Sequence, residues 1–325
     1  MLNCNTNYKV SDMNNNFQTP LSGIIPPMVT PLTSNSSLDL KGLNSLIEHL
    51  IKGGVHGIFI LGTTGESASL SMTLRENLIE QTLKIVNKRV PVLVGITDCS
   101  EEVSLRLARK AKDAGAKALV SAPPFYYSLG QQELIYYYEK LAEKLPLPIF
   151  LYNMPSHTKI FFDVKTVLEL SKHPNIIGLK DSSANTQYFQ SLLYSFQKNQ
   201  NFALLVGPEE ILAETVLLGG NGGVNGGANI FPELYVELYN ACVERDFSRI
   251  VPLQNLVMEI SSKIYTVGNN QSSYLKGLKT ALSFLEICDD YIASPLTSFN
   301  EKDKNTVFQW VREIQSSFSN VKLNK

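Results

Sequence analysis

A lysine stands at the end of an apolar run near the middle of the chain. Ile176–Leu179 carries no polar side chain, and Lys180 follows it directly. An ordinary lysine has a pKa near 10.4, so only about 0.04% of it is the neutral amine at pH 7. Burial lowers that pKa and makes the amine a nucleophile that can form a Schiff base with a keto group. The alternative is an ion-paired or surface-reaching lysine with no chemical role.

Two glycines and two threonines follow another apolar run, Gly57–Leu61. The segment Gly62–Ser67 reads GTTGES. Such a turn exposes backbone N–H groups and two hydroxyls, which are the donors that bind a carboxylate or a phosphate. Thr63 and Thr64 are therefore candidate substrate ligands. The alternative is an ordinary strand-to-helix turn in which Glu66 serves as a helix cap.

A tyrosine ends a third apolar run, Pro148–Tyr152, and a histidine follows five residues later. The Tyr152 hydroxyl is a candidate proton relay, although a lone tyrosine can also lie with its hydroxyl in water. His157 is open to three interpretations: a base, a substrate ligand or a solvated loop residue.

The glycine-rich segment and the histidines do not indicate a cofactor. Gly219–Gly227 has neither the Gly-Lys-Ser/Thr of a phosphate loop nor the dinucleotide spacing, so close backbone packing explains it better. The four histidines lack metal-ligand spacing, and no HExxH motif is present. We expect neither a metal nor an organic cofactor.

The elements that would position these residues alternate along the chain. Eight short apolar runs begin 20 to 34 residues apart and are separated by amphipathic stretches. This pattern predicts eight βα units, an α/β fold that closes as a (β/α)8 TIM barrel. The runs are Gly23–Val29, Gly57–Leu61, Pro91–Ile96, Ala118–Ser121, Pro148–Tyr152, Ile176–Leu179, Phe202–Val206 and Gly222–Val224. A doubly wound sheet is disfavoured because the first run leads into Pro26-Pro27 instead of a nucleotide-binding loop.

Helical periodicity fills the intervals and continues beyond the last strand. The spacing predicts helices over Leu40–Lys52, Glu101–Ala114, Glu133–Leu145 and Val164–Leu170. Strand signals stop after residue 245, where Asp246–Thr266, Gln271–Ile287 and Lys304–Phe318 read as helices. We expect a loose tail over 1–21, a barrel over 22–245 and a C-terminal helical bundle over 246–325 packed on the barrel. In such barrels the active site lies at the carboxyl ends of the strands, where the polar residues named above fall.

Composition places limits on the partners. The chain has 325 residues, 44% of them hydrophobic, and a net charge of −1, which gives no electrostatic footprint for nucleic acid or acidic membranes. No apolar run approaches the roughly 18 residues of a membrane helix. Four scattered cysteines form no disulfide framework, and the Asn-rich first 18 residues lack the apolar core of a secretion signal. From these features we expect a cytoplasmic protein. Charged residues make up only 18%, from which we expect a homo-oligomer.

In combination these motifs resemble those of one family. The chain from about residue 22 to residue 315 is similar to the pyruvate-dependent class I aldolases and lyases that include dihydrodipicolinate synthase and N-acetylneuraminate lyase. Gly62–Glu66 resembles the carboxylate-binding turn of that family, Tyr152–Pro155 its catalytic tyrosine motif, and Gly178–Asp181 its Schiff-base lysine motif. The three occur in the family's order.

The resemblance implies roles for individual residues. Lys180 would form an imine with the 2-keto carbon, Thr63 and Thr64 would hold the keto-acid carboxylate, and Tyr152 would move a proton. Tyr126 resembles a tyrosine that reaches across a dimer interface, and Val224 would line the pocket beside the pyruvate methyl. The family further implies a tetramer built as a dimer of dimers, a small 2-keto acid as the partner, and no cofactor beyond the covalent imine.

One position departs from the synthase pattern and bears on the second substrate. Where dihydrodipicolinate synthases carry an arginine after the segment that ends at Ser156, this chain has His157. Histidine lacks the bidentate fork that grips a carboxylate, a loss of about 1.5–3 kcal/mol. Sugar-acid members instead use polar groups after the later strands, and the matching candidates here are Ser182, Ser183, Glu209, Glu210 and Asn225. Helix N-terminal acids stabilised by the helix dipole are the alternative for one of the two glutamates.

We therefore predict a Schiff-base aldolase that releases pyruvate from a 2-keto-3-deoxy sugar acid or a related acyl sugar. The first alternative is a dihydrodipicolinate synthase that condenses pyruvate with aspartate semialdehyde. The second is a catalytically silent protein that binds a keto acid as a sensor.

Overall fold

The computed structural model describes residues 20–34, 36–199 and 201–323. Of the expected tail over 1–21, residues 1–19 lie outside the described part, whereas Leu21 is buried in the hydrophobic core.

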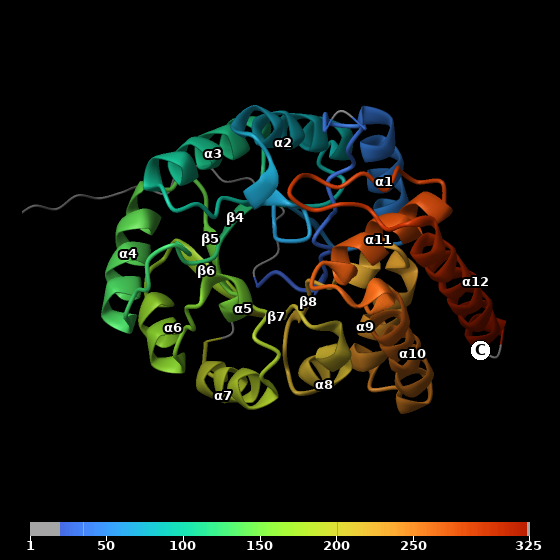
Figure 1. The fold of residues 1–325 in the computed structure, drawn as a ribbon. Coiled ribbons are helices and arrows are strands. Elements are labelled where there is room, and N and C mark those ends of the chain that lie inside the picture. The colour runs from blue at the N-terminus through green and yellow to red at the C-terminus, as the bar shows by residue number, and fades with distance from the viewer. Residues whose placement is uncertain (1–19, 35, 200, 324–325) are drawn as a thin grey trace, which may run out of the picture.

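Eight parallel strands form a closed barrel within the described residues (Figure 1). They pair in the order β1-β8-β7-β6-β5-β4-β3-β2, and the parallel bridge between Pro27 and Phe59 joins β1 to β2 and completes the ring. The predicted (β/α)8 fold is thus confirmed, and each strand lies within or overlaps its predicted run. The strands are β1 Gly23–Ile24, β2 Ile58–Ile60, β3 Val92–Gly95, β4 Ala118–Ser121, β5 Ile149–Asn153, β6 Ile176–Asp181, β7 Ala203–Val206 and β8 Gly222–Gly223.

Helices follow the strands and cover the outside of the barrel (Figure 1). Helix α1 illustrates why they form: the Asp39 side chain accepts a hydrogen bond from the Gly42 N–H at 3.0 Å, apolar residues recur with helical spacing, and Gly53 ends the helix. Four helices match the predicted ranges closely or fully: α1 Leu40–Lys52, α3 Glu101–Ala114, α4 Gln131–Lys144 and α6 Val164–Leu170. The others around the barrel are α2 Met72–Val86, α5 Pro155–Thr158, α7 Thr186–Phe196, α8 Leu212–Leu217 and α9 Pro232–Glu244.

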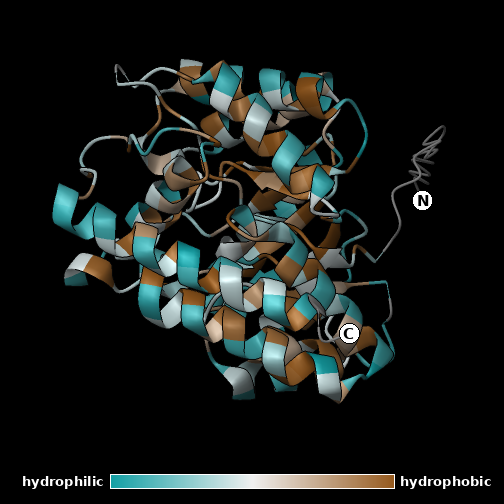
Figure 2. Cartoon of the chain, turned by 90° about the vertical axis from the view of Figure 1, so that its right-hand side faces the viewer, coloured by the Kyte–Doolittle hydropathy of each residue, from teal (hydrophilic) through white to brown (hydrophobic). Residues whose placement is uncertain are grey.

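Two apolar layers hold the barrel together. Ile25, Phe59, Leu93 and Phe150 belong to a cluster that fills its interior. A larger layer separates the strands from the surrounding helices. Figure 2 shows these helices carrying both hydrophilic and hydrophobic residues, as helices with one buried face do. A parallel sheet buried on both faces accounts for the continuous apolar runs in the sequence.

Three helices follow the barrel. They are α10 Phe247–Glu259, α11 Ser273–Phe284 and α12 Glu301–Leu323, and they correspond to the three predicted segments. Helix α10 continues into a π-helical turn over Ile260–Ile264. Helix α10 packs on α9, and α11 contacts the 3-10 turn Gly226–Asn229 that follows β8 (Figure 1). This contact brings α11 to the end of the barrel where the polar strand-end residues lie. Over the described residues, no helix combines the length and apolar character needed to cross a membrane.

Candidate active site

A cavity of about 610 Å³ opens at the carboxyl ends of the strands. It brings together nine of the predicted site residues, which come from β2, β5, β6, β7 and β8 or the segments that follow them. These are Thr63, Thr64, Tyr152, His157, Lys180, Ser182, Glu209, Glu210 and Val224. Residues up to 161 positions apart in the chain therefore share one pocket, as the barrel topology requires.

Lys180 lies inside this cavity on β6 with only 5% of its surface exposed. Its Nζ lies 4.2 Å from the centre of the Tyr152 ring and 5.0 Å from that of Phe59. Among the described residues no carboxylate lies within ion-pair distance of Nζ. Burial lowers the pKa of Lys180, and the Tyr152 hydroxyl opposes part of that shift. Both the surface-reaching and the ion-paired alternatives fail here, and burial shifts Lys180 toward the neutral amine.

Strand pairing places the lysine and the tyrosine side by side. In the β5–β6 ladder Tyr152 is paired with Lys180, and Asn153 is paired with Asp181. Because neighbouring residues of a strand point to opposite faces, the first pair faces the barrel interior and the second faces outward. Asn153 Nδ2 donates to Asp181 Oδ1 at 2.7 Å, and Ser183 Oγ donates to Asp181 Oδ2 at 2.9 Å. This outer network fixes the register in which the inner pair meets.

The turn after β2 presents its two threonines to the cavity. Thr63 Oγ1 lies 3.3 Å from the Tyr152 hydroxyl, and Thr64 Oγ1 lies 3.1 Å from the Tyr274 hydroxyl. Both distances permit hydrogen bonds, so the turn is linked to the candidate proton relay and to helix α11. The Glu66 side chain makes no capping hydrogen bond, which excludes the helix-cap alternative for it.

The two glutamates after β7 differ in their surroundings. Glu209 is 3% exposed; its Oε1 accepts from the hydroxyls of Tyr235 at 2.5 Å and Tyr265 at 2.8 Å, and its Oε2 accepts from the Gly227 N–H at 3.0 Å. Burial raises the pKa of Glu209 to about 7, against the lowering effect of these three hydrogen bonds. Glu210 is exposed and accepts from Ser261 Oγ at 2.5 Å. Glu209 thus ties the barrel to the C-terminal helices, while Glu210 stays open to the cavity.

Three predicted site residues, Ser183, Asn225 and Tyr126, do not line the cavity of a single chain. Ser183 instead makes the hydrogen bond to Asp181 described above. Asn225 is fully buried and donates from Nδ2 to the Gly207 carbonyl at 2.9 Å, which joins the segment after β8 to the segment after β7. Tyr126 is 78% exposed on the loop after β4, next to the exposed Phe125 and Tyr127. Tyr126 therefore needs a second subunit if it is to act in catalysis.

His157 and Ser182 are the neutral polar groups that β5 and β6 contribute to the cavity through the segments that follow them. His157 belongs to the short helix α5, where the Ser156 hydroxyl lies 3.0 Å from its Nδ1. Burial lowers the pKa of His157, with a smaller contribution from Lys159, so the imidazole is neutral at pH 7. Ser182 follows β6, and its N–H donates to the Asn153 carbonyl at 2.8 Å.

The sequence did not reveal the share of the C-terminal region in this cavity. Tyr265, Gln271, Ser272 and Tyr274 all line it, although they lie between the last strand and α11 or at the start of α11. These residues have no strand end to mark them, and their periodicity is that of any amphipathic helix. The glycines after β8 were the one sequence signal that another segment packs closely there. Gly226 lies so near the Tyr274 hydroxyl that a side chain at this position would collide with it.

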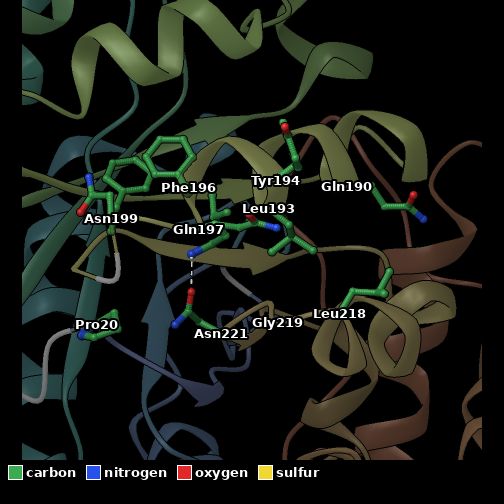
Figure 3. Close-up of a pocket in the computed structure, with 12 residues that line it drawn as sticks. Pro20, Gln190, Leu193, Tyr194, Phe196, Gln197, Asn199, Leu218, Gly219 and Asn221 are labelled. Atoms are coloured by element: carbon green, nitrogen blue, oxygen red, sulfur yellow. Dashed lines mark hydrogen bonds between the residues drawn. The ribbon is translucent and has the colours of Figure 1, made fainter.

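A second cavity of about 620 Å³ lies at the opposite, amino-terminal end of the strands (Figure 3). Pro20, Asn221 and residues of α7 line it, among them Tyr194, which is the one titratable side chain in its described lining. The two cavities have similar volumes, so their side chains distinguish them. The cavity around Lys180 holds the groups that can do covalent and proton-transfer chemistry.

Two further findings concern metals and thiols in the described part of the chain. No group of three or more histidine, cysteine or carboxylate side chains is placed to hold a metal ion. Cys99, Cys242 and Cys288 are free thiols.

Comparison with known proteins matches most of the chain. The model of the dihydrodipicolinate synthetase family matches residues 20–314. A probable 2-dehydro-3-deoxy-D-pentonate aldolase, YjhH, from Escherichia coli K12 is 30% identical over 289 residues, which cover 88% of this chain and 95% of the relative. A 4-hydroxy-tetrahydrodipicolinate synthase from Methanoculleus marisnigri is 37% identical over 229 residues, covering 70% of this chain and 78% of that protein.

Solved structures agree with this match. The structure described as dihydrodipicolinate synthase from Bacteroides thetaiotaomicron has a TM-score of 0.89 and 56% identity, and the match covers 91% of this chain and 99% of that one. YagE from E. coli K12, a dihydrodipicolinic acid synthase family protein solved with pyruvate, has a TM-score of 0.86 and 28% identity over 91% and 99% of the two chains.

Proposed function

Because this chain belongs to the dihydrodipicolinate synthetase family, we propose that it is an aldolase that cleaves a 2-keto-3-deoxy sugar acid or acyl sugar into pyruvate and an aldehyde. Members of the family are pyruvate-dependent class I lyases and aldolases that work through a lysine Schiff base and need no metal or organic cofactor. The predicted enzyme class is confirmed at this level. The substrate and the residues that act on it are the subject of the proposal.

The cavity offers a residue for each step. The neutral Lys180 amine attacks the keto carbon, and loss of water gives the iminium. Thr63 and Thr64 hold the neighbouring carboxylate with hydroxyl and backbone N–H donors. Tyr152 accepts the proton of the substrate hydroxyl as the carbon–carbon bond breaks. The electron pair of that bond passes to the iminium, and the aldehyde leaves. The resulting enamine takes up a proton, and water hydrolyses the imine to release pyruvate and free Lys180.

The observation that carries the choice of substrate is the absence of a second cation from the described cavity lining. Lys180 is its sole ammonium or guanidinium group, and His157 is neutral. A carboxylate on the second substrate would therefore be desolvated without a counter-charge, next to Glu209 and Glu210. Sugar hydroxyls find suitable partners instead: Glu210 accepts hydrogen bonds, and Ser182, Ser272 and the Gln271 amide both donate and accept them.

The second candidate function is condensation of pyruvate with aspartate semialdehyde. It is favoured by the 56% identity to the Bacteroides thetaiotaomicron structure described as a dihydrodipicolinate synthase. For that reaction the carboxylate of aspartate semialdehyde would need a binding partner, and the described cavity lining offers no cation for it besides Lys180.

Borohydride trapping with a substrate panel tests the proposal. The protein is incubated with pyruvate, with several 2-keto-3-deoxy sugar acids, and with pyruvate plus aspartate semialdehyde, and the adduct is mapped by mass spectrometry. We expect a pyruvate-sized adduct on Lys180 from pyruvate and also from at least one sugar acid, and none with Lys180→Ala. Consumption of aspartate semialdehyde alone would favour the synthase. No adduct on Lys180 under any condition would favour the silent keto-acid-binding protein.

We further propose that two subunits pair through the loop that carries Phe125, Tyr126 and Tyr127. Three adjacent exposed aromatic side chains are costly to leave in water and are typical of protein–protein contacts. Pairing would bring Tyr126 of one subunit toward the cavity of the other. The free thiols are compatible with a reducing compartment such as the cytoplasm.

A further inference from the structure

A buried ion pair connects the Thr63–Thr64 turn to helix α11. Lys279 Nζ lies 2.5 Å from Glu66 Oε2, and the two side chains are 0% and 2% exposed. Lys279 Nζ also donates to the Tyr291 carbonyl at 2.6 Å. Glu66 Oε1 accepts from the Ala293 N–H at 2.7 Å. Among the described residues, the ion-pair and hydrogen-bond partners of the Glu66 carboxylate are thus Lys279 and Ala293, 213 and 227 residues further along the chain.

The backbone of this turn needs such support. Leu61 and Glu66, at its two ends, have φ values of +57° and +58°, a conformation that residues with side chains rarely adopt. Such residues persist where the surrounding structure holds them in place. Thr30 Oγ1 donates to the Gly65 carbonyl at 2.7 Å and holds the turn from the barrel, while Lys279 and Ala293 hold it from the opposite side through Glu66.

Stability is a weak explanation for this pair. A buried ion pair gains little over well-packed apolar residues, because desolvation offsets the attraction between the charges. The pair does two things that apolar residues cannot. It fixes the Glu66 side chain in one position, and it cancels a negative charge two residues from Thr64. An uncancelled buried carboxylate there would repel the substrate carboxylate that the threonines bind.

We infer that Lys279 is a positioning residue that acts through Glu66 to hold Thr63 and Thr64 in their carboxylate-binding conformation. Helix α11 supports the same turn a second time, since Tyr274 lies in hydrogen-bond range of Thr64. The C-terminal region is then part of the binding site for the keto acid. This inference rests on the imine at Lys180 and on the carboxylate role of the threonines, and it is independent of the second substrate.

The test measures how the rate of borohydride inactivation depends on pyruvate concentration. Lys279→Met removes the ammonium and leaves Glu66 charged. We expect the half-saturating pyruvate concentration to rise about tenfold or more, with the trapping rate at saturation changed by less than about threefold, because uniform binding is lost while Lys180 is untouched. A folded Lys279→Met protein with wild-type half-saturation would overturn the inference.

A double variant keeps the test informative if Lys279→Met does not fold. Glu66→Gln combined with Lys279→Met has no lone charge, and the glutamine oxygen can still accept from the Ala293 N–H. We expect a half-saturating concentration above that of the wild type and, where Lys279→Met also folds, below that of Lys279→Met. A double variant equal to the wild type would show that only the lone charge matters and would overturn the positioning role.

The matched control breaks an ion pair elsewhere in the bundle. Arg249 of α10 forms ion pairs with Glu237 and Glu244 of α9, away from the turn. Arg249→Met should lower the melting temperature and leave the pyruvate half-saturation unchanged. An equal rise in the half-saturating pyruvate concentration in Arg249→Met and Lys279→Met would mean that general loss of stability is responsible, and the inference would fail. Failure of the wild type to form any adduct would instead contradict the proposed function.

Discussion

Two buried lysines in this chain show how the surroundings decide what a side chain can do. Burial lowers the pKa of both Lys180 and Lys279. Lys279 faces the Glu66 carboxylate, which opposes the shift and favours the ammonium. Lys180 has no carboxylate within ion-pair distance among the described residues, and its burial against the rings of Tyr152 and Phe59 shifts it toward the neutral amine. The same residue type is therefore proposed to serve as a fixed charge in one place and as a nucleophile in the other.

Glu209 gives a prediction at the residue scale for the pH dependence of stability. Burial raises its pKa to about 7 in the folded protein, above the ordinary value of 4.5. The folded state therefore holds this proton more tightly than the unfolded state. Its contribution to stability is fully present below about pH 4.5 and is lost as the pH rises through 7, a fall on the order of 3 kcal/mol.

The measurement is the free energy of unfolding in urea at pH 5 and at pH 8. Glu209→Gln retains an oxygen that can accept from Tyr235 and Tyr265 but cannot ionise. We expect the wild type to lose more stability between the two pH values than Glu209→Gln does, by roughly that amount. Parallel pH dependences in the two proteins would contradict a protonated, buried Glu209.

At the scale of elements, the sequence predicted the positions of the strands in the chain better than the residue pairing between neighbouring strands. All eight apolar runs became strands because a parallel sheet buried on both faces demands them. That Lys180 and Tyr152 share a cavity also followed, since strand ends meet at one mouth. The direct pairing of the two residues did not follow, because it depends on the β5–β6 register and on a bulge between Ile149 and Phe150. Tyr274 could not be predicted either, since only the packing of α11 brings it to the turn.

The outer Asn153–Asp181 contact gives a prediction at this scale. Asn153→Ala removes a 2.7 Å hydrogen bond to Asp181 and leaves the Phe162 N–H without its acceptor. We expect a loss of about 1–3 kcal/mol in unfolding free energy. We also expect roughly tenfold slower imine trapping at saturating pyruvate, because small displacements of a reacting group are costly.

The opposite end of the same strand supplies the control. Asn175 precedes β6, and its Nδ2 donates to the carbonyls of Ala142 at 3.0 Å and Leu147 at 3.2 Å. Asn175→Ala should destabilise the protein by a similar amount and leave the trapping rate unchanged. If both variants slow trapping alike, the register at the barrel mouth is not what Asn153 secures.

At the scale of the whole molecule, one chain does not complete the proposed site. The Tyr152 hydroxyl reaches Thr63, yet Tyr126 does not line the cavity of its own chain. If Tyr126 completes the proton relay in the site of a second subunit, mixing the inactive variants Tyr126→Phe and Lys180→Ala in one dimer should restore an active site. Tyr126→Phe lacks the hydroxyl, and Lys180→Ala lacks the nucleophile, so each variant alone should lose at least about a hundredfold in rate.

In a mixed dimer, one of the two sites combines Lys180 of one chain with Tyr126 of its partner, and the other site lacks both. Random pairing of equal amounts makes half of the dimers mixed, so roughly a quarter of the wild-type activity should return when the two variants are co-expressed. Tyr127→Phe in place of Tyr126→Phe serves as the control, and its sites should be active without any mixing. Sedimentation velocity must show at least dimers throughout. Activity that stays at the level of the separate variants, in a protein shown to be dimeric, would place Tyr126 outside the catalytic site.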